Sequence, residues 1–239
     1  MLRLRRRHRG YLIVLTVEIA ILLLLPLAQA VSWLLSFLMI SLCSVLIAYV
    51  SRYSTLRRTR PLVYGLGAVA VAMEIIWKWA LYFDPATGLW LTLPHVIAWL
   101  LFLTLALVRK VKSLVREPYV TTSVVMGAAS GYLLVGIAGG VLLNAVSVLS
   151  PSTFALPVVP QAAAGLTPDG QVQHAVLGQL ANAPALMAAS FNLLTTVGSS
   201  VANPIDVLGQ VSITIITVSG QLYVAILIAL ILGRFHKRR

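Results

Sequence analysis

The stretch Thr195-Thr196-Val197-Gly198-Ser199-Ser200 decides how the rest of the chain is interpreted. It lies between a segment of small residues, Ala183–Leu194, and a long apolar run, Ile205–Gly233. A short polar turn that contains glycine has no role between two apolar segments of a soluble core. Inside a membrane, non-helical backbone is tolerated only where it is buried in protein or faces a water-filled cavity. The second of these alternatives predicts a pore.

The composition predicts a membrane protein that crosses the bilayer several times. Of the 239 residues, 59% are hydrophobic and only 10% are charged. The net charge is +12, and every basic residue except Lys78 falls in one of four clusters: residues 3–9, 52–60, 109–116 and 234–239. These clusters lie at alternate ends of the apolar segments, which is the positive-inside pattern. Anionic lipid headgroups are sufficient partners for them. Nucleic acid is not an expected partner, because no basic face with interleaved aromatic residues occurs.

Six apolar segments are long enough to cross a bilayer, which takes roughly 20 residues. They are Tyr11–Gln29, Val31–Val50, Leu62–Phe83, Trp90–Val108, Tyr119–Leu149 and Ile205–Gly233. The basic loops Arg52–Arg60 and Arg109–Arg116 are expected inside, which places both termini in the cytoplasm of a cell (plasma) membrane protein. The basic N-terminus, its apolar run and Ala28-Gln29-Ala30 also resemble a signal peptide with a cleavage site after Ala30. The length of the run and Glu18 within it favour an uncleaved first helix.

The region between the last two segments predicts a loop that re-enters the membrane. Prolines and glycines predict an irregular outer loop over residues 150–181. Asn182 as N-cap and Pro184 in the first turn predict a pore helix over residues 182–194, which is too short to span. The expected fold is therefore all-α, with the pore helix and a filter at 195–200 between the fifth and sixth transmembrane helices. Residues 1–118 form a peripheral four-helix unit, and residues 119–239 form a pore domain with an outer helix at 119–149 and an inner helix at 205–233.

Three blocks of the second half resemble a known family. They are Gly131–Gly136 followed by Pro151–Phe154, Ser190–Gly198 followed by Pro204, and Gly220–Leu227. In this order they are similar to the outer helix, the pore loop and the inner helix of prokaryotic potassium channels with one pore loop per chain. The resemblance covers residues 119–239. It implies a homotetramer that passes monovalent cations passively, with no cofactor besides the permeant ion.

The resemblance also implies the chemistry of the filter, residues Thr195 to Ser200. Four chains would supply a ring of carbonyl oxygens that replaces the hydration shell of K⁺. The ion would bind at Thr196, Val197 and Gly198, with the Thr196 hydroxyl as an inner ligand and glycine permitting the necessary backbone angles. Ser199, Ser200 and Val201 stand where the family has tyrosine, glycine and usually aspartate, and a positive φ is costly at Ser200. A cation pore with reduced or absent potassium selectivity, which also admits Na⁺, is expected. The alternative is that Thr-Val-Gly merely ends a re-entrant helix and conducts nothing.

Charged residues inside apolar segments are candidates for function. Glu74 and Lys78 have the i, i+4 spacing of a pair on one helix face. The pair is either a gating element or a self-neutralised structural pair. Glu18 is expected to approach that pair or a basic loop. The fourth segment has no recurring arginines, so voltage gating of the usual kind is not expected, and His95 is interpreted as an interfacial side chain.

Two further residues have two interpretations each. Gly220 is either a gating hinge of the inner helix or a packing residue. Asp169 and Asp206 could each form a ring of negative charge at the outer mouth of the pore. Asp206 could instead cap the last helix.

The sequence indicates no enzyme, because its four histidines are far apart and no catalytic constellation converges. Two rivals to a channel remain. One is a subunit of a potassium-uptake transporter, although those usually carry four pore-loop units in one chain. The other is a non-conducting regulatory or structural subunit that associates with a channel bearing an intact filter.

Overall fold

The computed structural model describes residues 2–31, 33–53, 60–115, 121–150, 152–154, 182–199, 204 and 206–236. Over these residues the chain is helical, with α1 (Leu2–Ala30), α2 (Leu34–Tyr53), α3 (Arg60–Phe83), α4 (Pro85–Val115), α5 (Thr122–Leu149), α7 (Ala183–Leu194) and α8 (Val207–His236). Six of these helices are long and apolar enough to cross a membrane, and the 12-residue α7 is the exception. The chain is therefore a multi-pass membrane protein, as its composition predicts.

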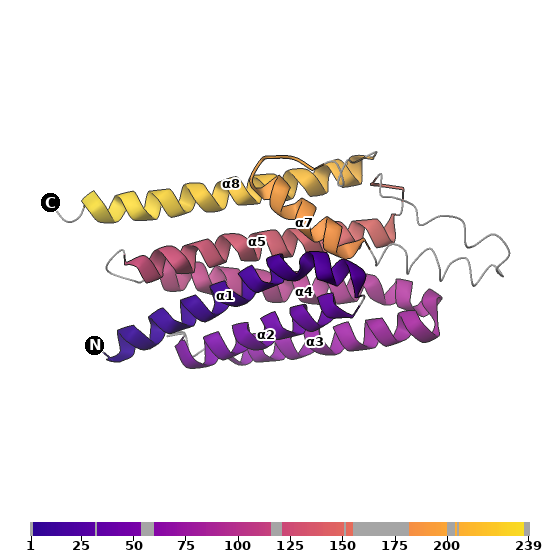
Figure 1. The fold of residues 1–239 in the computed structure, drawn as a ribbon, viewed down its shortest axis with the longest axis horizontal. Coiled ribbons are helices and arrows are strands. Elements are labelled where there is room, and N and C mark those ends of the chain that lie inside the picture. The colour runs from indigo at the N-terminus through magenta and orange to yellow at the C-terminus, as the bar shows by residue number, and fades with distance from the viewer. Residues whose placement is uncertain are drawn as a thin grey trace.

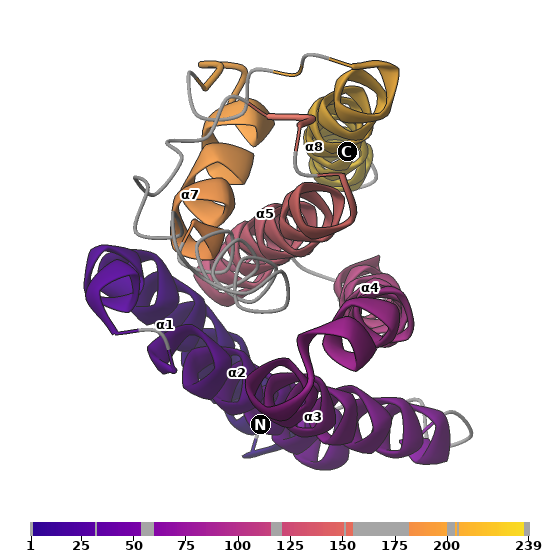
Figure 2. The same ribbon diagram turned by 90° about the vertical axis from the view of Figure 1, so that its right-hand side faces the viewer.

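The six long helices run side by side along one direction, and both ends of the chain lie at the same end of the bundle (Figure 1). In the view along that direction, α1, α2 and α3 form one side, whereas α5, α7 and α8 form the other (Figure 2). Helix α4 contacts both α3 and α5 and so joins the two sides.

One hydrophobic core extends across both sides of the bundle. It contains buried residues from each of α1 to α5 and also Met187 of α7. Helix α5 is the most buried of the six long helices and α8 is the least buried. Since α8 lies at the edge, most of its apolar surface is left for lipid or for another chain. The division into a peripheral unit and a pore domain stays a prediction, because α5 packs on α1 and α4 as well as on α7 and α8.

The connection between α3 and α4 is only one residue long, so α4 begins five residues before the Trp90 expected from the sequence. Asp84 alone separates α3 from α4, and Pro85 is the first residue of α4. Proline fits this position because the amide that it lacks would have no helical partner there. Other boundaries move by a few residues: α2 begins at Leu34, and α8 spans Val207–His236.

The predicted basic loop Arg109–Arg116 is also wrong as far as Val115, because α4 continues through it. Arg109 and Lys110 are buried within the helix, with only 4% and 1% of their surface exposed. The basic residues did not end the helix because Lys110 has a buried acidic partner, described below. The remainder of this loop lies outside the described residues, as do residues 54–59 of the other predicted inner loop and residues 155–181 of the outer loop, with Asp169.

Candidate functional site

Three glycines of α5 allow α7 to approach that helix closely. A Cβ on Gly140 would lie 2.9 Å from the Cα of Met187, and one on Gly139 would lie 2.5 Å from the Oγ of Ser190. The Ser190 hydroxyl donates to the carbonyl of Gly136 across the same contact, at 2.6 Å. Helix α7 is therefore fixed against α5 by backbone-to-backbone packing and by a buried hydrogen bond.

Helix α7 is antiparallel to α5 and ends near the middle of the bundle. Met187, in its second turn, lies close to Gly140, whereas at its end the Leu194 carbonyl accepts a hydrogen bond from the hydroxyl of Tyr132, at 2.9 Å. Leu194 also meets Gly220 in the middle of α8, where a Cβ would lie 2.6 Å from the leucine Cδ1. The contact supports the packing interpretation of Gly220, and its role as a hinge stays a prediction. Figure 1 shows the oblique course of α7 from one end of the bundle toward its middle.

The chain leaves α5 and returns to α8 at the same place. Phe154, just after α5, forms an isolated antiparallel bridge with Pro204, just before α8. The Thr153 hydroxyl donates to the carboxylate of Asp206 at 2.9 Å, and that carboxylate also accepts from the amide of Gly209 at 2.8 Å. Asp206 therefore caps α8, which is one of the two roles open to it from the sequence. At the start of α7, Asn182 occupies the N-cap position, but its side chain makes no capping hydrogen bond.

The Thr-Val-Gly stretch folds back on the end of α7. The amide of Thr196 donates to the Leu193 carbonyl and that of Val197 to the Asn192 carbonyl, both at 3.0 Å. Thr196 has a φ of 61°, which is left-handed. The two hydrogen bonds and this left-handed residue together form a Schellman motif, which ends the helix. Glycine usually takes this position, and a β-branched residue there is strained. Gly198 follows, with a φ of 82° and its amide 3.3 Å from the same Asn192 carbonyl.

The residues predicted as ion ligands lie on the surface of the single chain. Thr195, Thr196, Val197 and Gly198 are exposed, Val197 by 78%. The hydroxyl of Thr196 donates to the carbonyl of Thr195 at 2.6 Å. Ser199 is half-buried. Ser200 lies outside the described residues, as does Val201.

A polar stripe on α8, which the sequence interpretation missed, runs past the same region. Gln210, Thr214, Thr217 and Gln221 follow i, i+4, i+7, i+11 spacing, so they share an arc of about 60° of the helix. Gln210, Thr214 and Gln221 are exposed, and the Thr217 hydroxyl points to the Leu193 carbonyl, 3.5 Å away. The stripe could have been predicted from the spacing of these residues alone, because polar residues that repeat on one face of a transmembrane helix indicate a face that avoids lipid.

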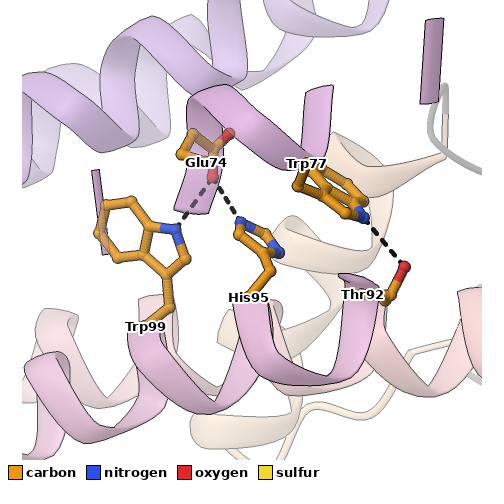
Figure 3. Close-up of polar contacts among 5 residues, drawn as sticks. All are labelled: Glu74, Trp77, Thr92, His95 and Trp99. Carbon is orange, nitrogen blue, oxygen red and sulfur yellow. Dashed lines mark hydrogen bonds and ion pairs between the residues drawn. The ribbon is translucent and has the colours of Figure 1, made fainter. Parts of the chain in front are cut away.

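A second polar cluster lies between α3 and α4 (Figure 3). One carboxylate oxygen of Glu74 accepts from His95 Nε2 at 2.7 Å and from Trp99 Nε1 at 2.9 Å. The His95 ring stacks on Trp77, with centroids 4.3 Å apart. His95 is thus 6% exposed, and its interpretation as an interfacial side chain is wrong. The sequence paired Glu74 with Lys78 on its own helix, and the two charges do interact. The carboxylate also accepts two hydrogen bonds from α4, which the sequence did not predict.

A third cluster joins α1, α4 and α5. Glu18 and Lys110 are fully or almost fully buried, with Nζ 3.5 Å from Oε1, and Ser130 hydrogen-bonds to both. Glu18 was expected to approach the Glu74–Lys78 pair or a basic loop. Its partner is indeed a lysine assigned to a loop, although that lysine lies in a helix.

No protein-family model, no curated protein and no solved structure matches the chain. The described geometry defines its class as a helical multi-pass membrane protein with a short apolar helix packed on α1, α5 and α8.

Proposed function

We propose that the chain is the subunit of a homotetrameric channel that passes monovalent cations, K⁺ and Na⁺, passively across the cell membrane. One observation carries the proposal: the polar segment Thr195–Gly198 is exposed on the single chain, at the end of a short helix that reaches the middle of α5 and α8. Both termini are assigned to the cytoplasm on the positive-inside pattern of the sequence.

The physical argument concerns what covers that segment. Backbone that is not helical and lies at membrane depth does not face lipid, because its polar groups would lack partners. Other copies of the chain, arranged around an axis, would replace lipid by protein and by water. A re-entrant α7 would then point its C-terminal end, with its partial negative charge, toward a central path for cations.

Helix α8 has surfaces suited to this assembly. Its buried face, which includes Ile216 and Tyr223, lies on the rest of the chain. Its polar stripe would line the water-filled path, and an adjacent apolar face with exposed Val211, Ile215 and Leu222 would face lipid or a neighbouring copy. Because Thr217 of the stripe lies beside the end of α7, one continuous polar surface is available to an ion.

The expected selectivity is low. Ser199, Ser200 and Val201 replace the tyrosine, glycine and acidic residue of the family that the sequence resembles, so the outer ion sites lack their usual frame. The proposed filter therefore uses the carbonyls around Thr196, Val197 and Gly198 and does not strongly exclude Na⁺.

Flux through purified protein in liposomes tests the proposal. We expect K⁺ and Na⁺ flux of similar size, and reduced flux in the variant Gln221→Leu, because an apolar side chain removes part of the polar stripe. The matched control is Ile215→Leu on the exposed apolar face of the same helix. A protein that forms tetramers in the bilayer and conducts neither ion would refute the pore, and a high K⁺ to Na⁺ permeability ratio would refute the proposed selectivity.

The Schellman motif favours a second candidate, a non-conducting subunit of a channel with an intact filter. In this motif the amides of Thr196 and Val197 serve only to end α7. This candidate predicts no flux from the chain alone and tight co-purification with a conducting channel.

A further inference from the structure

A cavity of about 530 Å³ lies between the first four helices and the start of α7. The ends of α1 and α3 and the start of α2 line it, together with α4, α5 and the first residues of α7. Its volume is within the range of sites that hold small organic molecules, roughly 300–1,000 Å³. Three tryptophans, Trp33, Trp77 and Trp99, give it broad apolar walls.

Two polar atoms of residues that line this cavity have no hydrogen-bond partner among the described residues. They are Oδ1 of Asn144 and Nδ1 of His95, and each is buried. The other ring nitrogen of His95 lies 2.7 Å from a carboxylate oxygen of Glu74, which only accepts when it is ionised, so that nitrogen carries the hydrogen. In the neutral ring, Nδ1 is then an acceptor (Figure 3). The cavity therefore offers two buried acceptors that need a donor.

The charges around the cavity favour a neutral occupant. Glu74 contributes one negative charge and Lys78, one turn later on α3, contributes one positive charge. Because these charges balance, a ligand with a net charge would be buried without a counter-charge of its own. An ammonium group would also meet Lys78, and a carboxylate would meet Glu74 and two acceptors.

We propose that this cavity binds a neutral amphiphile, with an apolar body against the tryptophans and a hydroxyl or N–H group that donates to Asn144 and His95. A long-chain alcohol is the simplest member of this class. The proposal does not rest on ion conduction, because the site is defined by residues away from Thr195–Gly198.

Quenching of tryptophan fluorescence by bromodecanol tests the proposal on the full chain in nanodiscs. The background variant is W33F/W79F/W90F, because those three tryptophans are 64%, 64% and 84% exposed, whereas the two that remain, Trp77 and Trp99, are buried and line the cavity. We expect saturable quenching by bromodecanol that is reversed by unlabelled decanol but not by decane. Bromodecanoate and bromodecylamine should quench less at equal membrane concentration. Quenching that does not saturate would overturn the proposal, and so would stronger binding of either charged probe.

The variant Asn144→Leu tests the donor–acceptor contact with little change in size. It should bind bromodecanol about fivefold more weakly, which corresponds to one lost hydrogen bond. The control Thr16→Val removes a hydroxyl that is exposed on α1 and should leave the affinity unchanged. Unchanged affinity in Asn144→Leu would overturn the assigned contact. If that variant does not fold, the competition between decanol and decane on the background protein decides the question.

Discussion

The buried pair Glu18–Lys110 should affect the stability of the protein strongly, and the effect of replacing one partner should depend on whether the other is present. The Lys110 side chain is 1% exposed, that of Glu18 is fully buried, and the Ser130 hydroxyl lies between them. The variant Lys110→Met leaves a carboxylate in the apolar core with only the serine as a partner. The variant Glu18→Gln leaves an ammonium group in the same place.

The expected magnitude follows from the distance. At 3.5 Å between Nζ and Oε1, two unit charges attract by about 5 kcal/mol at an effective dielectric constant of about 20. Removing one partner of a buried pair typically lowers the free energy of unfolding by about 3–5 kcal/mol, because the other charge stays buried. Replacing both partners by uncharged groups is often nearly neutral. The double variant should therefore be more stable than either single variant.

Unfolding by SDS in mixed micelles, followed by helical circular dichroism, measures these free energies in a double-mutant cycle. The matched control is Lys112→Met, since Lys112 is exposed on the same helix and its replacement should change stability by about 0.5 kcal/mol or less. Losses in the two single variants that simply add in the double variant would refute a buried, coupled pair. A loss of less than about 1 kcal/mol in Lys110→Met would refute the burial itself.

Three further variants test other contacts by the same unfolding assay. Gly140→Ala should lower the free energy of unfolding by about 1–3 kcal/mol, because its Cβ would lie 2.9 Å from the backbone of Met187. The control Gly65→Ala, with open space around it, should be neutral or stabilising. Equal effects of the two variants would contradict the close contact. Thr196→Gly should raise the free energy of unfolding by about 1 kcal/mol, because glycine adopts the left-handed conformation without strain. A loss of stability would argue against that conformation. Glu74→Leu should lower the free energy of unfolding by about 1–3 kcal/mol for each N–H donor that it leaves unpaired. Glu74→Gln keeps an acceptor and should lower it clearly less. Equal losses in the two variants would show that the two donors do not depend on this acceptor.

The sequence was sufficient to predict the helices because apolar length and charge position are local properties. Six long helices and the short helix at Ala183–Leu194 were predicted within a few residues, except where charged residues occurred. Lys110 shows why the exception arose. Its charge indicated a loop in the sequence, but a partner 92 positions earlier, Glu18, allows it to stay in a buried helix.

The partners of Glu74 were unpredictable for the same reason. The i, i+4 rule considers only neighbours on one helix, whereas the carboxylate is bound by His95 and Trp99 of another. The polar stripe on α8 was predictable, since it depends only on helical spacing. The cavity was not, because it is formed by five helices and the first turns of α7, which meet only in the folded chain.

The two proposed functions differ by a small change in the backbone after α7. To turn its carbonyls toward a central axis, the proposed filter would give up the hydrogen bonds from the amides of Val197 and Gly198 to Asn192, each worth about 1 kcal/mol net. The same change would release the strain of Thr196 at a φ of 61°, which is about 1–3 kcal/mol. These terms nearly cancel, so contacts between copies and the bound cation need to supply only a small free energy. Stabilising the left-handed turn with glycine at Thr196 should therefore reduce flux while it increases the stability of the single chain.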